Sequence, residues 1–296
     1  MPAVSDGVLL VDKPAGVTST RALGAAKRAL GLRKAGHTGT LDPFATGLLP
    51  LVFGEATKFS RFLLDADKTY RAKLRLGYTS TTGDTEGDIS AFDGISPTID
   101  AVSPVLTGLL GPLDQVPPMH SAVRIDGRRL YDLARQGVEV PRQARRVQIY
   151  ELDLLSFSAD LLEISVKCSK GTYVRTLAEE IGRRLGCGAY LIGLRRTAIG
   201  RFGVDEALEP DALAALGEEA ARERLLAPEV LVESLPVLEL GEEGARALCN
   251  GQEWPVDSQG VEGECGVFGP GHRFLGVGRL TAGRLSAARL MHTGHG

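Results

Sequence analysis

Alternation of apolar and polar residues sets the strongest limit on how this chain folds. A period of two, typical of half-buried β-strands, occurs in three segments. They are TYRAKLRLGYT (69–79) and both halves of RVQIYELDLLSFSADLLEISVKC (146–168). GVLLVDK (7–13) and LIGLRRTAIGRF (191–202) are also strand-like. Helix-like segments lie between them in no regular alternation: STRALGAAKRALGL (19–32) and TLAEEIGRRLGCG (176–188). Because strands outnumber helices and the two are mixed in order, the sequence predicts an α+β fold.

The C-terminal part of the chain differs in composition from the rest. EALEPDALAALGEEAARERLLAPEVL (206–231) is acidic and helix-like. Beyond it, glycines separate short apolar runs, as in GECGVFGPGHRFLGVGRL (263–280), which indicates a small β-barrel-like domain. We therefore place a domain boundary near residue 236 and expect domains 1–236 and 237–296.

Cysteine spacing and hydropathy exclude several classes of protein. Cys168, Cys187, Cys249 and Cys265 form no CxxC pair and have no histidine at metal-ligand spacing, so we expect neither a metal site nor a redox pair. No apolar run approaches the ~18 residues of a membrane span. The N-terminus, MPAVSDGVLLVDKP, lacks the basic start and long apolar stretch of a signal peptide. We expect a cytoplasmic protein that does not bind a membrane.

The net charge of −3 is distributed unevenly along the chain. Residues 1–75 carry 12 Lys and Arg against 6 Asp and Glu, and residues 119–200 carry 14 against 9. Residues 76–118 hold six acids and no base, and residues 201–296 hold 8 bases and 16 acids. If the two basic blocks meet in space, they form a local phosphate-binding face on an acidic protein. Solvated faces balanced by neighbouring acids explain the same counts equally well.

A glycine-rich segment, GHTGTLDPFATGLLPLVFGEATKF (36–59), carries the most informative local pattern. An aspartate followed by a proline is typical of a helix N-cap with proline at the first helical position, so Asp42 and Pro43 indicate a helix start. From the residues alone we favour this interpretation over a catalytic carboxylate. His37 is, on the same basis, a partner of that carboxylate, a stacking platform or an ordinary loop residue.

The same segment resembles the signature of the TruB family of tRNA pseudouridine synthases. Five further blocks resemble family segments in the same order: VDKPAGVTS (11–19), LGYTSTTGDTEGDI (76–89), SAVRIDGRRLYDLARQGVEVPRQARRV (121–147), CSKGTYVRTLAEEIG (168–182) and CGAYLIGLRRTAIG (187–200). The part beyond residue 237 resembles, more weakly, the RNA-binding PUA domain. The resemblance implies a mixed β-sheet flanked by helices in the catalytic domain, followed by a PUA-like β-barrel.

The resemblance also implies a reaction, the isomerisation of uridine to pseudouridine at position 55 in the T-loop of tRNA. The N1 glycosidic bond breaks, the uracil turns, and C5 joins the same ribose carbon, so neither a cofactor nor a metal is required. An ionised carboxylate must act as nucleophile or base near the sugar, and the family pattern assigns this role to Asp42. Arg175 is implied as the cation that keeps the pKa of Asp42 low. Without the resemblance, Arg175 would be a surface or phosphate-binding residue.

Aromatic and apolar residues of the uracil site follow from the same family pattern. Tyr70 is implied to stack on the uracil and to help remove the C5 proton, while Tyr173 and Leu194 wall the pocket. Asp84 is implied to join the network of Arg175 and Tyr70, and His37 to fill the space of the flipped base. By their spacing alone, the two tyrosines and the leucine belong to the core of a strand.

A basic excursion at about 121–146 resembles the mobile insertion with which the family closes on RNA. The residues expected at the RNA backbone are Lys13, Lys58, Arg124, Arg128, Arg129, Arg142, Arg145 and Arg146. For Lys13 and Lys58, the alternative to a contact with the RNA backbone is a structural role. At position 81 the family pattern has Asp at least as often as the Thr found here. The contacts of Thr81 in the loop that carries Asp84 are therefore left open.

The implied partner is the T-arm of tRNA, bound by a monomer without a guide RNA. One alternative is a guide-RNA-dependent enzyme of the dyskerin type, against which the insertion and the absence of a long basic tail argue. Another is a tRNA chaperone without catalysis, against which the Asp, Tyr and Arg set argues. A glycosidase using Asp42 and Asp84 as paired carboxylates is the weakest alternative.

Overall fold

The structure is a computed structural model that describes residues 5–121, 124–125, 127–134, 136–257 and 260–292. Its larger sheet has the strand order β1-β3-β12-β4-β11-β10-β7, with β2 paired to β3 and β13 to β12. The strands are β1 (Gly7–Lys13), β2 (Ala35–His37), β3 (Thr46–Phe53), β4 (Lys68–Leu76), β7 (Gly111–Gln115), β10 (Arg145–Ser158), β11 (Leu161–Cys168), β12 (Ala189–Ile199) and β13 (Phe202–Gly203). β12 runs parallel to β3 and antiparallel to β4, so the sheet is mixed, and the predicted α+β class is confirmed.

Two helices that the sequence predicted cover parts of this sheet. In α1 (Ser19–Leu30), the Thr18 side chain accepts a hydrogen bond from the backbone of Arg21, and the helix ends at Gly31 in the left-handed conformation. Its buried face packs against β1 and β3 in one apolar cluster. In α5 (Val174–Leu185), the apolar face packs into a second cluster with residues of β4, β10, β11 and β12. Amphipathic spacing therefore places both helices on the sheet.

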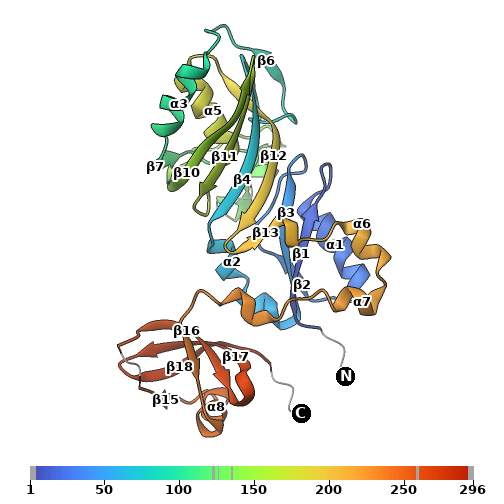
Figure 1. The fold of residues 1–296 in the computed structure, drawn as a ribbon, viewed down its shortest axis with the longest axis vertical. Coiled ribbons are helices and arrows are strands. Elements are labelled where there is room, and N and C mark those ends of the chain that lie inside the picture. Colours follow the sequence, from blue (N-terminus) through green and yellow to red (C-terminus); the bar gives the residue numbers. More distant parts are fainter. Residues whose placement is uncertain (1–4, 122–123, 126, 135, 258–259, 293–296) are drawn as a thin grey trace.

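Shorter elements complete the larger part of the molecule. They are α2 (Arg61–Asp65), α3 (Ile99–Thr107), α6 (Pro210–Ala215) and α7 (Glu218–Arg222), the 3-10 helices η1 (Gly54–Phe59), η2 (Val204–Glu206) and η3 (Pro228–Leu231), and the small pair β5 (Tyr78–Ser80) and β6 (Ile89–Ala91). Figure 1 shows α3 and α5 together on one side of the upper sheet, and α1, α6 and α7 beside β1.

The predicted helix start at Asp42 is wrong. Asp42 lies in a non-helical segment between β2 and β3, and the apolar run after it forms β3, which β1 and β12 flank. Gly47 in β3 has φ 105°, and a Cβ atom there would lie 2.2 Å from the carbonyl oxygen of Arg196. Glycine is required at this position because β3 and β12 approach too closely for any side chain.

A smaller curled sheet follows, in the order β14-β16-β17-β18-β15. Its elements are β14 (Val237–Glu239), α8 (Glu242–Cys249), β15 (Trp254–Pro255), β16 (Gly263–Gly269), η4 (Pro270–His272), β17 (Arg273–Thr281) and β18 (Arg284–Leu290). Phe268 and Phe274 of this sheet pack with Phe59 and Phe202 of the larger part in one shared cluster. Figure 1 shows the smaller sheet at one end of an elongated molecule.

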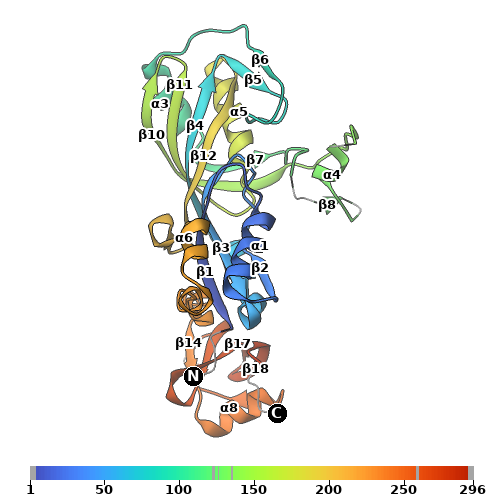
Figure 2. The ribbon, with the colours of Figure 1, turned by 90° about the vertical axis from the view of Figure 1, so that its right-hand side faces the viewer.

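The chain between β7 and β10 leaves the sheet as an excursion. It contains the short pair β8 (Arg124–Ile125) and β9 (Arg128–Arg129) and the helix α4 (Leu130–Ala134). Figure 2 shows this excursion projecting sideways from the larger sheet. Met119, Leu130 and Leu133 form a small apolar cluster of its own, separate from the clusters of the two sheets. Across the described residues, no helix is long and apolar enough to cross a membrane.

Candidate active site

Asp42, Tyr70 and Arg175 line one pocket of about 260 Å³. They come from the segment between β2 and β3, from β4 and from the first turn of α5, respectively. Tyr173 and Leu194 line the same pocket, from the residue before α5 and from β12. The mixed sheet thus brings together five residues that are up to 152 positions apart in the chain.

Arg175 links the two carboxylates of the site. Its Nε lies 3.2 Å from Oδ2 of Asp42, and its Nη1 lies 3.3 Å from Oδ2 of Asp84. It also donates to the backbone carbonyls of Thr82 (3.1 Å) and His120 (2.6 Å). The Arg175 and Asp84 side chains are only 5% and 1% exposed, whereas that of Asp42 is 33% exposed. Asp42 is therefore the carboxylate of this network that a substrate can reach.

The expected low pKa of Asp42 is wrong in direction. Burial raises the pKa of Asp42 above its ordinary value, and the charge of Asp84 adds to this effect. Arg175 and Lys13 lower the pKa but do not outweigh burial. Partial desolvation makes the carboxylate more basic, which suits a group that must attack a carbon or remove a proton.

Tyr70 is partly buried and packs against two apolar clusters, that of α5 and that of α1. Burial raises the pKa of Tyr70, while the nearby Arg196 guanidinium lowers it. The hydroxyl is therefore protonated at neutral pH, which favours stacking and argues against a standing phenolate. Arg196 is a site residue that the sequence interpretation missed: it is 1% exposed, lines the pocket and donates to the carbonyls of Leu48 (2.7 Å) and Gly39 (3.1 Å).

A larger pocket of about 630 Å³ adjoins the first and contains His37. The residues that line both pockets are Thr40, Leu41, Asp42, Ser121 and Arg175. Burial and the charge of Arg196 lower the pKa of His37, so its ring is neutral at neutral pH. Its buried Nδ1 has no hydrogen-bond partner within the described part of the chain. A neutral ring at the entrance to the Tyr70 pocket is suited to stacking on a base.

The loop that carries Asp84 is closed by hydroxyl groups. Thr82 donates to Oδ1 of Asp84 at 2.6 Å, and the backbone of Glu86 donates to the same oxygen at 2.9 Å. Thr81 does not join this network, because its hydroxyl accepts from the backbone of Asp88 at 3.0 Å. The threonine at this position thus closes the turn, while Thr82 holds Asp84.

Lys13 does not have the position expected of an RNA-backbone residue. Its side chain is fully buried, and its Nζ donates to the carbonyls of Pro14 (2.8 Å), Val17 (2.7 Å) and Pro43 (3.3 Å). Burial lowers the pKa of Lys13 to about 8. These contacts favour the structural role, since Lys13 joins the loop after β1 to the segment that carries Asp42.

Lys58 joins the two parts of the molecule. It forms an ion pair with Glu55 and donates to the carbonyl of Leu290 in β18 at 2.8 Å. Its side chain remains 31% exposed. A contact of Lys58 with the RNA backbone stays a prediction.

The arginines of the excursion differ in their surroundings. Arg128, Arg145 and Arg146 are exposed. For Arg124 and Arg129 the structure describes the backbone pairing of β8 and β9, and their side chains lie outside the described residues. RNA contacts by these five residues stay predictions.

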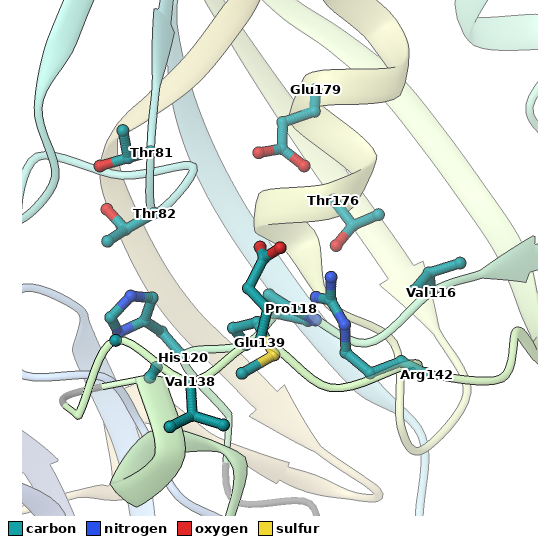
Figure 3. Close-up of a pocket in the computed structure, with 13 residues that line it drawn as sticks. Thr81, Thr82, Val116, Pro118, His120, Val138, Glu139, Arg142, Thr176 and Glu179 are labelled. Atoms are coloured by element: carbon teal, nitrogen blue, oxygen red, sulfur yellow. The ribbon is translucent and has the colours of Figure 1, made fainter.

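Arg142 faces inward, contrary to expectation. Its Nη1 donates to the carbonyl of Pro117 at 3.0 Å, and its buried Nε has no partner among the residues that the structure describes. It lines a pocket of about 480 Å³ beside α5, together with Glu139, Thr176 and Glu179. Figure 3 shows Arg142 beneath Thr176, with His120 and Thr82 on the other side of the pocket. The base of the excursion thus faces the helix that carries Arg175 across this pocket.

No group of three or more His, Cys, Asp or Glu side chains in the described ranges has the arrangement of a metal site. Asp42, Tyr70 and Arg175 are the predicted catalytic side chains that line the pocket. A carboxylate beside a fixed guanidinium, facing an aromatic ring, can act on the sugar of a nucleoside whose base stacks on that ring.

Family models match the chain over most of its length. Residues 27–174 match the N-terminal domain of TruB family pseudouridylate synthases, and residues 175–233 match the C-terminal domain of tRNA pseudouridylate synthase B. Residues 236–291 match the C-terminal region of pseudouridine synthase II TruB.

Curated proteins and solved structures agree with these models. The protein named tRNA pseudouridine synthase B of Azoarcus sp. (strain BH72) is 51% identical over 98% of this chain and 96% of its own length. The protein of the same name in Aromatoleum aromaticum is 52% identical over 98% and 94%. A chain in the crystal structure of a Cbf5-Nop10-Gar1 complex is 26% identical, with a TM-score of 0.73 over 94% of this chain and 79% of that one. The chain therefore belongs to the TruB family of pseudouridine synthases.

Proposed function

We propose that this protein isomerises uridine to pseudouridine at position 55 in the T-loop of tRNA. The observation that carries the proposal is the meeting of Asp42, Tyr70 and Arg175 in one pocket. Curated relatives that match almost the whole chain are named tRNA pseudouridine synthase B, which supports tRNA as the substrate. The specific position in the T-loop follows from the family resemblance of the sequence.

The pocket geometry supports a mechanism in which the target nucleotide is flipped out of the loop. Flipping costs a few kcal/mol, and stacking on an aromatic ring returns roughly 1–3 kcal/mol. The uracil would stack on Tyr70 between Tyr173 and Leu194, while His37 would occupy the space that the base leaves.

Asp42 would then act on the ribose. As a nucleophile it would bond to C1′ and displace N1 of uracil; as a base it would remove a proton from C2′ as the same bond breaks. The freed uracil then turns. In the first case C5 bonds to C1′ as the bond between Asp42 and C1′ breaks; in the second, C5 bonds to C1′ and Asp42 returns the proton to C2′. In both cases C5 then loses its proton and N1 takes one up, which completes the isomerisation. Arg175 would hold the carboxylate and oppose its protonation. The low exposure of Arg175 fixes the position of its charge.

We further propose that the protein acts as a monomer in the cytoplasm without a guide RNA. The excursion between β7 and β10 stands beside the active-site entrance, since His120, Ser121 and Tyr131 line the His37 pocket. Its exposed arginines would bind phosphates of the T-arm directly, so that no guide RNA is needed to hold the substrate.

Tritium release from a tRNA transcript with C5-labelled uridine tests this proposal. The purified protein alone should release tritium, and sequencing after chemical labelling of pseudouridine should place the product at position 55. Asp42→Asn should bind the same transcript and release no tritium above background. Activity only after a guide RNA is added would support the dyskerin-like alternative. Improved tRNA folding without tritium release would support the chaperone alternative.

A further inference from the structure

Ser121 has a buried hydroxyl group that makes no hydrogen bond within the part of the chain that the structure describes. The residue is 6% exposed, and its Oγ has no hydrogen-bond partner among the described residues. Both backbone groups of Ser121 are paired: its N–H donates to the carbonyl of Met119 (2.9 Å), and its carbonyl accepts from the backbone of Tyr131 (3.0 Å). A buried hydroxyl without a partner destabilises a folded protein, so such a group requires an explanation.

The position of Ser121 in the site explains why its hydroxyl group is left without a partner. It lines both the Tyr70 pocket and the His37 pocket, together with Asp42 and Arg175. These shared residues lie where the two pockets adjoin, and we call this boundary the neck. The carbonyl of the preceding residue, His120, accepts a hydrogen bond from Arg175 at 2.6 Å, which ties the Ser121 segment to the catalytic network.

The neck is where the sugar of a flipped nucleotide must lie. If the base stacks on Tyr70, Asp42 can act on the ribose only when C1′ and C2′ face the residues that share the neck. The 2′-hydroxyl is attached to C2′, next to the carbon whose bond to the base breaks. It is therefore the hydroxyl group of the ribose closest to the reacting bond.

We propose that the Ser121 hydroxyl binds the 2′-hydroxyl of the target uridine and so positions the ribose against Asp42. Ser121 is then a substrate-binding residue that distinguishes a ribonucleotide from a deoxyribonucleotide at the reacting position. This role rests on the proposed function. It explains why a hydroxyl is kept where an apolar side chain would suit the folded protein better.

Equilibrium binding tests the proposal in the Asp42→Asn background, in which turnover does not interfere. The probes are two T-arm hairpins that carry uridine or 2′-deoxyuridine at the target position. Asp42→Asn should bind the uridine hairpin about three- to tenfold more tightly than the 2′-deoxyuridine hairpin, as expected for one neutral hydrogen bond. The variant that also carries Ser121→Ala should bind both hairpins with equal affinity, close to that of the deoxyuridine hairpin before the change.

Thr38→Val provides a matched control. Thr38 is also fully buried, but its hydroxyl donates to the carbonyl of Pro50 at 3.3 Å and lines neither pocket. Its loss should lower the melting temperature and leave the preference for uridine unchanged. Ser121→Ala should not lower the melting temperature, because it removes a hydroxyl without a protein partner.

Three results would overturn the proposal. They are an unchanged preference for uridine after Ser121→Ala, no preference in Asp42→Asn alone, and an equal loss of affinity for both hairpins. The last result would point to a phosphate partner or to a structural role. Failure of the proposed function would look different, because the wild-type protein would then release no tritium from tRNA.

Discussion

Nε of Arg175 lies 3.2 Å from Oδ2 of Asp42, while Nη2 on the same guanidinium donates to the carbonyl of His120 at 2.6 Å. The residue that holds the proposed catalytic carboxylate is thus also held by the base of the excursion that would contact RNA. This arrangement makes the position of Asp42 depend on both α5 and the excursion.

Arg175→Lys should therefore reduce turnover more than affinity. Lysine keeps the charge but cannot reach Asp42, Asp84 and two carbonyls at once. We expect kcat to fall about 100-fold, as for a catalytic group misplaced by about 1 Å, with little change in the Kd for tRNA. Single-turnover rates and filter binding separate the two effects. A change in Kd with normal kcat would contradict this account of Arg175.

The pH dependence of catalysis should reflect the raised pKa of Asp42. Since the proposed mechanism requires the ionised form of Asp42, activity should fall with decreasing pH at a midpoint above the ordinary range for aspartate. Asp84→Asn removes a negative charge that raises this pKa, so the midpoint should move to lower pH. Asp153→Asn removes an exposed charge on β10 that lines neither pocket and should leave the midpoint in place. Single-turnover rates across pH measure these midpoints, and a midpoint moved upward by Asp84→Asn would contradict the prediction.

Asp42→Asn should make the folded protein more stable at pH 8. Because the pKa of Asp42 is higher in the folded state, folding favours the protonated carboxyl, and its contribution to stability decreases as pH rises through that pKa. Asparagine resembles the protonated form at every pH. The advantage of the variant should therefore disappear below the ordinary pKa of aspartate. Thermal unfolding at pH 8 and at pH 3, below the ordinary pKa of aspartate, measures the difference, and lower stability of Asp42→Asn at pH 8 would show that Arg175 outweighs burial.

Lys13 and Arg145 should respond differently to substitution. Lys13→Met leaves three loop carbonyls without their donor and should lower stability by about 2–3 kcal/mol. It should not change the slope of log Kd against log salt, because the side chain is buried. Arg145→Ala, at an exposed position, should leave stability unchanged and reduce that slope by about one. A smaller slope of log Kd against log salt for Lys13→Met would contradict this prediction and would indicate that Lys13 contacts a phosphate.

Sequence patterns predicted the elements whose periodicity is long and regular. Alternation predicted the strands β4, β10 and β11, and amphipathic spacing predicted the helices α1 and α5. The pairing of these strands within the sheet agrees with the alternation. The pattern failed at Asp42, because Asp-Pro is equally compatible with a helix start and with a loop. What decided between them was the pairing of β3 with β1 and β12, which lie far away in the chain.

The site residues were predictable as a set, but their electrostatics were not. The family motif identified the carboxylate, the arginine and the tyrosine that the structure places in one pocket. Nothing local to Lys13 or Arg196 shows that these charged side chains are buried against loop carbonyls. The direction of the pKa shift of Asp42 likewise depends on how much protein surrounds it, which only the three-dimensional structure shows.

The most direct test is a comparison of pseudouridine formation in a tRNA transcript by the wild-type protein and by Asp42→Asn, with no added RNA or protein. The account predicts tritium release from C5-labelled uridine at position 55 by the wild type, and a rate lower by more than about 1,000-fold in the variant, with tRNA binding retained. Comparable tritium release by the two proteins would contradict it.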